Sequence, residues 1–191
     1  MKVMGTTTFC ETPLLTAPGL VMTPRPATEQ LVAAAAERIR GCGACVADVG
    51  TGSGAIALGL AQQVPDAEIW ASDTSPAAVA LAARNALRLG LSDRVHVRRG
   101  DLLEPLPGEF DLIVANLPYL PEAARSRHPE LVAEPDEAIF APGDGLGPYR
   151  RLLASAEERL LPGGAVLIQL HRRVLVAESE ELAAFRARLA A

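Results

Sequence analysis

The sequence predicts an α/β fold built on a doubly wound, mostly parallel sheet, and three observations carry this prediction. Short apolar runs alternate along the chain with stretches of helical period, the pattern of parallel strands joined by helices. One run, 45–49, is followed at once by the glycine-rich turn 50–54 and a helical pattern from Ala55, an order typical of nucleotide-binding sheets. A later run, 110–115 (FDLIVA), is apolar almost throughout, as expected of a parallel strand covered on both faces.

The composition is that of one globular domain, with room for a small appendage. The chain has 191 residues, of which 49% are hydrophobic, enough for a sizeable core. Its formal net charge of -5 does not favour a dedicated nucleic-acid binder. The sequence has neither an apolar run of transmembrane length nor a signal peptide, so we expect a cytoplasmic protein.

Cysteine and histidine spacing does not predict a metal site. Cys42 and Cys45 have C-x-x-C spacing, but a zinc site needs about four ligands and the sequence holds no second pair. Cys45 also begins an apolar run, where cysteine is usually a small core residue. The histidines form no cluster along the chain; they are His96, His128 and His171. We therefore expect no metal ion.

Residues 1–28 are predicted to form an N-terminal hairpin and lead-in segment ahead of a main domain at 29–191. Two short apolar pieces, 7–10 and 19–22, are expected to pair around the turn-forming residues between them. Two prolines then hold the chain extended up to the first helix.

In the main domain, apolar residues at helical spacing predict helices, and short apolar or alternating runs predict strands. The predicted helices are 29–40, one from 55 onward, 75–89, 148–161 and 178–189. The predicted strands are 45–49, 67–72, 94–98, 110–115 and 165–170. A long loop, 120–147, interrupts the alternation, and loops of this length are usually functional or mobile. Since one helix follows the last predicted strand, we expect an abbreviated C-terminal end.

The turn after the first predicted strand is a candidate ligand-binding loop. It consists of Gly50, Thr51, Gly52, Ser53 and Gly54. Its glycines let the backbone take positive φ and approach a ligand, and the next helix begins with free N–H groups. The looser dinucleotide pattern G-x-G-x-x-G/A is also satisfied, and a glycine turn without a ligand is a further alternative. Asp48, placed to meet an ammonium group, and the run GTGSG resemble the first motif of class I methyltransferases, which bind S-adenosylmethionine (SAM).

Acidic residues follow the next two predicted strands. Asp73 stands at the carboxyl end of the second strand, about twenty residues beyond the glycines, where an acid commonly binds ribose hydroxyls. Asp101 follows the third strand in the same way. Both are therefore candidate ligand-binding residues at the same edge of the sheet.

The tetrapeptide Asn116, Leu117, Pro118, Tyr119 ends the fourth predicted strand and suits methyl transfer to a planar NH2 group. The Asn116 side-chain oxygen and the Leu117 carbonyl can accept the two N–H groups of an amide or adenine, at about 2.9 Å each. These hydrogen bonds turn the nitrogen lone pair toward the methyl donor, and the Tyr119 ring can pack against the planar face of the acceptor group. Alignment supplies the rate, and no general base is needed before transfer. A plain turn after a strand is the alternative reading.

The chain resembles the HemK/PrmC family of protein-(glutamine-N5) methyltransferases over most of residues 9–170. The resemblance rests on the segments Pro24-Arg25-Pro26-x-Thr28-Glu29, DVGTGSGAIAL, Ser72-Asp73-x-Ser75, GDLLEPLPGEFDLIVANLPY, Glu134-Pro135 with Ala138, and Gly143-Asp144-Gly145-Leu146-x-x-Tyr149-Arg150. It implies a Rossmann-like class I methyltransferase fold, SAM as cofactor, and methylation of the glutamine of the GGQ motif in a peptide-chain release factor.

The resemblance also implies roles for individual residues. The loop 50–54 would hold the methionine end of SAM, Asp73 the ribose, and Asp101 with Leu102 the adenine neighbourhood. The tetrapeptide from Asn116 to Tyr119 would hold the substrate glutamine, with Asn116 also lying against the cofactor.

Several features depart from the family pattern. Leu117 stands where the family usually has proline, and Gln169 where it usually has an acid. The helical N-terminal domain of the family has no counterpart in the sequence. Two alternatives therefore stay open: a nucleic-acid adenine-N6 methyltransferase, whose chemistry at Asn116 would be similar, and a catalytically degenerate SAM-binding subunit. A dimer mate or partner could then cover the sheet edge.

Overall fold

The computed structural model describes residues 4–171 and 173–190. Residues 1–3 of the predicted N-terminal segment, and residues 172 and 191 of the predicted main domain, lie outside this range. The strands are β1 (Gly5–Phe9), β2 (Thr12–Thr16), β3 (Cys45–Val49), β4 (Glu68–Asp73), β5 (Val95–Arg99), β6 (Phe110–Ala115), β7 (Leu120–Pro121), β8 (Phe140–Ala141), β9 (Leu160–Leu170) and β10 (Arg173–Glu178). The α-helices are α1 (Glu29–Ile39), α2 (Ala55–Gln63), α3 (Pro76–Arg88), α4 (Gly147–Ala156) and α5 (Leu182–Ala190). Within these ranges, no helix combines the length and apolarity needed to cross a bilayer.

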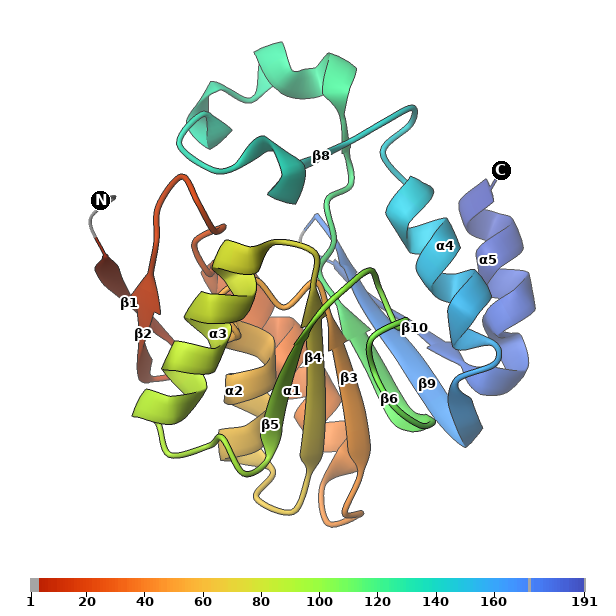
Figure 1. Cartoon of the computed structure of the whole chain (residues 1–191). Helices are drawn as coiled ribbons and strands as arrows, with labels where there is room; N and C mark the ends of the chain where they lie inside the picture. The colour runs from red at the N-terminus through yellow and green to blue at the C-terminus, as the bar shows by residue number, and fades with distance from the viewer. Residues whose placement is uncertain (1–3, 172, 191) are drawn as a thin grey trace.

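The main sheet confirms the predicted doubly wound architecture. Its strand order is β10-β9-β6-β3-β4-β5, and every pairing is parallel except that of β10 with β9 (Figure 1). From β3 the chain proceeds outward through β4 to β5 and then returns to β6 on the other side of β3. The order of strands therefore reverses between β3 and β6, which opens a crevice at their carboxyl ends.

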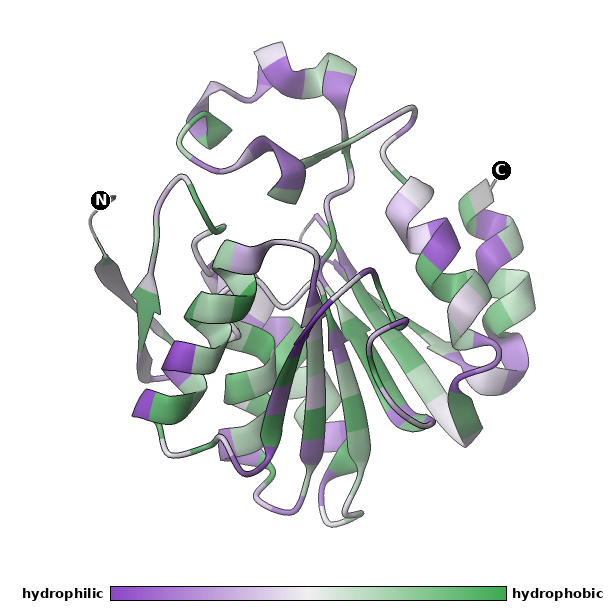
Figure 2. Ribbon diagram, in the orientation of Figure 1, coloured by the Kyte–Doolittle hydropathy of each residue, from purple (hydrophilic) through white to green (hydrophobic). Residues whose placement is uncertain are grey.

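Side chains of the central strands alternate between two cores. Val46 and Leu112 belong to the core beneath α1 and α2, whereas Ala47 and Ile113 belong to the core beneath α4 and α5. Successive residues of a strand point to opposite faces, so a strand covered on both sides is apolar at most positions, and the buried Asp48 of β3 is an exception. Figure 2 shows this in the mainly hydrophobic colour of the central strands. The predicted bounds of β3 and β6 coincide with the observed ones.

The N-terminal hairpin differs from the prediction. β1 pairs with β2, and residues 19–22 are not a strand. The turn consists of Cys10 and Glu11, both at positive φ (46° and 60°), which matches the twist of a two-residue hairpin. The Cys10 N–H donates to Glu29 Oε1 at 3.0 Å, so the first residue of α1 holds the turn. No glycine marked this turn in the sequence, which is why it was missed.

The C-terminal elements also differ. The predicted helix 148–161 ends as α4 at Ala156, because the chain turns there and the Arg159 carbonyl accepts from the Phe110 N–H at 2.8 Å. β9 begins at Leu160, ahead of the predicted strand 165–170, and its register on β6 shifts between Leu160 and Ala165. β10 then forms an antiparallel strand that covers the edge of β9, so the C-terminal end contains a strand that the prediction lacked.

Candidate functional site

The glycine-rich loop leaves β3 at the crevice and is bonded to the end of β4. The N–H groups of Gly50 and Thr51 both donate to the Ser72 carbonyl at 2.9 Å. Gly54 begins α2 at φ +83°, and an added Cβ would lie only 3.1–3.3 Å from neighbouring side chains and backbone of α2 and α3. Glycine is therefore required there both by the backbone conformation and by the close packing of two helices.

A cavity of about 250 Å³ lies over the carboxyl ends of β3, β4 and β6. The structure brings ten of the predicted site residues to its wall: Gly50, Thr51, Gly52, Ser53, Asp73, Asp101, Leu102, Asn116, Leu117 and Pro118. Three predicted residues, Asp48, Gly54 and Tyr119, are not part of this wall. Hereafter this space is called the cofactor cavity, after the role that the resemblance predicts for its residues.

Asp73 is fixed by two backbone groups at the edge of the cofactor cavity. Its Oδ2 accepts from the Gly52 N–H and its Oδ1 from the Ser75 N–H, both at 2.9 Å. Burial raises the pKa of the Asp73 carboxyl, and these N–H groups oppose the rise. Each carboxylate oxygen has a further lone pair, so the group can still accept hydrogen bonds from a diol such as a ribose.

Asp48 lies beneath the loop rather than in the cofactor cavity. It is fully buried, and its Oδ2 accepts from Thr51 Oγ1 at 2.7 Å and from the Ala57 N–H at 3.1 Å. Its Oδ1 is buried without a hydrogen-bond partner in the described part of the chain. Burial raises the pKa of the Asp48 carboxyl from 3.8 to about 7. In this structure its direct contacts hold the loop and the start of α2.

Replacement of Asp48 with asparagine is expected to flatten the pH dependence of stability. The folded protein keeps the Asp48 proton up to a pKa of about 7, whereas the unfolded chain loses it near 3.8. The folded state therefore binds more protons in this window, and the free energy of unfolding falls as pH rises through it, by up to about 4 kcal/mol. Urea unfolding at several pH values should show this slope in the wild type and a shallower one in Asp48→Asn.

The matched control for this prediction is Asp93→Asn, which changes an exposed carboxyl. This variant should keep the wild-type pH profile. An unchanged slope in Asp48→Asn would mean that Asp48 is ionised in the folded protein throughout the window.

Asp101 and Leu102 form the far wall of the cofactor cavity. Asp101 makes an ion pair with Arg151 of α4. Leu102 adopts φ +47°, and its carbonyl accepts from Ser72 Oγ at 2.6 Å. A left-handed leucine costs on the order of 1 kcal/mol, so this hydrogen bond and the surrounding packing maintain a conformation that leucine does not favour.

The tetrapeptide follows β6 at the crevice where the strand order reverses between β3 and β6. Asn116 Nδ2 donates to Thr28 Oγ1 at 3.3 Å, which leaves Asn116 Oδ1 free to accept from a ligand. The Leu117 side chain packs against the glycine loop, since a Cβ added to Gly50 would lie 2.6 Å from Leu117 Cδ2. Thr28 was not predicted as a site residue; the resemblance to a family motif was the only signal for it.

A second, wider cavity of about 1270 Å³ adjoins the first. Asn116, Leu117 and Pro118 line both, so the two cavities meet at the tetrapeptide. Tyr119 faces only the second cavity, with its ring edge-on to His171 at 4.9 Å between ring centroids. Hereafter this space is called the acceptor cavity, after the role that the resemblance predicts for Asn116 to Tyr119.

The long loop crosses above the site and binds the lead-in segment. Glu134 Oε2 accepts from the Thr23 N–H at 3.0 Å, and Glu134 Oε1 lies 3.5 Å from Arg25 Nη2. Arg25 lines both cavities. Glu134 thus holds one wall of the site in place, a function that is set by contacts distant in sequence.

Known proteins similar to this chain are methyltransferases. A family model described as "Methyltransferase small domain" matches residues 25–143. The release factor glutamine methyltransferase of Deinococcus radiodurans is 47% identical over 161 residues, 83% of this chain and 57% of that protein. The protein of the same name from Gloeobacter violaceus is 43% identical over 154 residues, 78% of this chain and 54% of that protein. The chain spans about half the length of these curated relatives.

A solved structure shares the fold. The ribosomal protein L11 methylase of Lactobacillus delbrueckii subsp. bulgaricus superposes with a TM-score of 0.57 at 28% identity, covering 79% of this chain and 63% of that one. Together with the curated relatives, this confirms the resemblance and the fold that were predicted from the motifs.

Proposed function

Because the chain belongs to the methyltransferase small domain family, we propose that it is a SAM-dependent N-methyltransferase that methylates a glutamine side-chain amide in a protein, of the release-factor kind. The observation that carries the proposal is the meeting of the two cavities at Asn116 and Leu117. A transfer reaction needs a donor and an acceptor that approach each other at one point, and these residues stand at that point.

The residues of the cofactor cavity fit SAM. The backbone of the loop 50–54 would hold the methionine end, Asp73 the ribose hydroxyls, and Asp101 with Leu102 the adenine neighbourhood. The fit rests on the two free lone pairs of Asp73 and on the close approach that the glycine backbone allows. When bound, SAM supplies a methyl group that is already activated on its sulfonium, so the protein has no need to activate it.

The protein then has to position the acceptor nitrogen of the glutamine amide beside the methyl group. Asn116 Oδ1 and the Leu117 carbonyl would accept the two N–H groups of the glutamine amide, which fixes the plane of the amide and turns the nitrogen lone pair toward the cofactor cavity. Tyr119 would pack against the flat face of the amide from the acceptor cavity. Such alignment can supply several kcal/mol of rate acceleration without a general base.

The experiment that tests the proposal measures transfer of labelled methyl from SAM to a release factor. We expect label on the wild-type release factor and none on a variant whose GGQ motif is changed to GGA. Bulk RNA is the parallel acceptor. Label on RNA instead would favour the adenine reading, and SAM binding without label on either would favour a non-catalytic subunit.

A further inference from the structure

The hydroxyl of Tyr149 links Leu117, which follows β6, to Gln169 of the neighbouring strand β9. Tyr149 is fully buried beneath the tetrapeptide. Its hydroxyl oxygen accepts from the Leu117 N–H at 2.9 Å and lies 2.6 Å from the Gln169 carbonyl and 3.2 Å from the Leu117 carbonyl. Desolvation raises the pKa of the Tyr149 hydroxyl, so the group is a neutral phenol with one proton.

That one proton can be donated to one carbonyl at a time. The contact to the Gln169 carbonyl is shorter by more than half an ångström, so this carbonyl takes the proton. The Leu117 carbonyl then keeps its lone pairs for a ligand, while the Leu117 N–H is held by the phenol oxygen. The hydroxyl thus orients the Leu117 peptide and leaves its carbonyl available.

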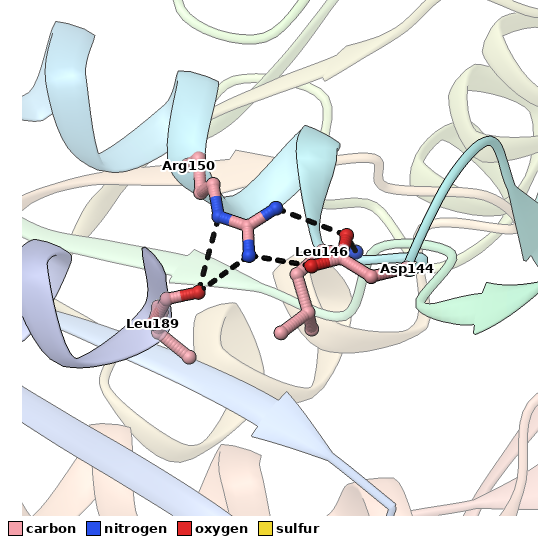
Figure 3. Close-up of polar contacts among 4 residues, drawn as sticks. All are labelled: Asp144, Leu146, Arg150 and Leu189. Atoms are coloured by element: carbon pink, nitrogen blue, oxygen red, sulfur yellow. Dashed lines mark hydrogen bonds and ion pairs between the residues drawn. The ribbon is translucent and has the colours of Figure 1, made fainter. Parts of the chain in front are cut away.

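The start of α4 is itself anchored, so the phenol is held in place. Arg150, the next residue, pairs with both carboxylate oxygens of Asp144 at 2.9 and 2.5 Å and donates twice to the Leu189 carbonyl near the end of α5 (Figure 3). The Asp144 carboxylate also accepts from the Leu146 N–H, just before α4. The first turn of α4 is therefore bound to the loop before it and to α5.

We propose that Tyr149 is a positioning residue for the acceptor amide: its hydroxyl fixes the Leu117 peptide and directs the Leu117 carbonyl at the substrate N–H. This inference rests on the proposed function, because it assigns Leu117 to the acceptor. Tyr149 lines neither cavity, so its hydroxyl acts only through the Leu117 peptide, whose carbonyl the proposed function assigns to the acceptor. Its removal should therefore affect acceptor methylation and spare SAM binding.

The test is Tyr149→Phe, which keeps the ring in the core and removes only the hydroxyl. We expect kcat with the protein acceptor to fall about 10- to 100-fold, the loss typical of a small misplacement of an aligned group, with the Kd for SAM unchanged. Amide hydrogen exchange at Leu117 should speed up by about tenfold or more, because its N–H loses its partner. Leu153→Val is the matched control: it trims a buried side chain of the same helix and should leave kcat and Leu117 exchange as in the wild type.

The outcomes separate the two claims. If the wild type methylates the acceptor and Tyr149→Phe keeps its kcat, the inference is overturned while the proposed function stands. If the wild type transfers no methyl, the proposed function fails, and the exchange rate at Leu117 still decides whether the hydroxyl holds this peptide. An equal loss in Leu153→Val and Tyr149→Phe would reduce the role of Tyr149 to packing, and so would overturn the inference.

Discussion

Methyl transfer is expected to fall roughly 100- to 1000-fold when Asn116 is replaced with alanine, the loss typical of one preorganised hydrogen-bonding group in an active site. Asn116 lines both cavities, and in the proposed function its Oδ1 accepts one N–H of the substrate amide. Without it, the proposed arrangement would leave the amide with the Leu117 carbonyl alone, so the nitrogen lone pair would no longer be held toward the methyl group. The measurement is kcat for label transfer, beside the Kd for SAM.

The control must separate this role from the contact between Asn116 and Thr28. Thr28→Val removes the partner of Asn116 Nδ2 and keeps Asn116 Oδ1. We expect a loss in this variant that is at least tenfold smaller than in Asn116→Ala. A kcat in Asn116→Ala above about a tenth of the wild-type value would place the acceptor amide elsewhere.

Gly145→Ala is expected to destabilise the protein by about 3 kcal/mol or more and to abolish activity. Gly145 has φ +88°, and a Cβ built there would lie 2.2 Å from the Tyr119 carbonyl oxygen and 2.8 Å from its carbon. Both partners are backbone atoms, so no side chain can move aside to make room. Accommodating the methyl group would displace the peptide that follows the tetrapeptide. Urea unfolding and the label-transfer assay measure the two effects.

Gly143→Ala is the matched control for this prediction. Gly143 also has positive φ, +68°, but an added Cβ there would meet nothing within 4 Å. Its substitution should cost only the backbone strain, about 1 kcal/mol, with activity retained. Similar losses in the two variants would show that strain in the loop, and not the contact with Tyr119, sets the need for glycine at 145.

Local sequence was sufficient for the centre of the sheet. β3 and β6 are mainly apolar runs that end just before Gly50 and Asn116, so their bounds could be predicted from the local sequence. The cofactor loop was predictable because glycines at three alternate positions mark a backbone of positive φ. Asp73 was predictable because it follows a strand, where the fold class brings acids to the ligand.

Other parts depended on pairing between distant segments. The hairpin turn at Cys10 and Glu11 carries no glycine. It is stabilised by a hydrogen bond from the Cys10 N–H to Glu29, nineteen positions further along the chain. β10 pairs antiparallel with the edge of β9. Its short apolar run 174–177 is compatible with a strand, but only the pairing shows that it extends the sheet. The lengthening of β9 requires a register shift on β6 that only the pairing defines.

The sequence by itself determined the α/β class, the glycine loop and the residue types of the acceptor tetrapeptide, because each depends on a local backbone requirement or a strand end. Only the tertiary structure decided that Asp48 is buried beneath the loop instead of lining the cofactor cavity. It also decided that Thr28 contacts Asn116 and that the Tyr149 hydroxyl lies against Leu117. These are hydrogen bonds between residues 32 to 88 positions apart, and such contacts arise only when the sheet and its helices are packed.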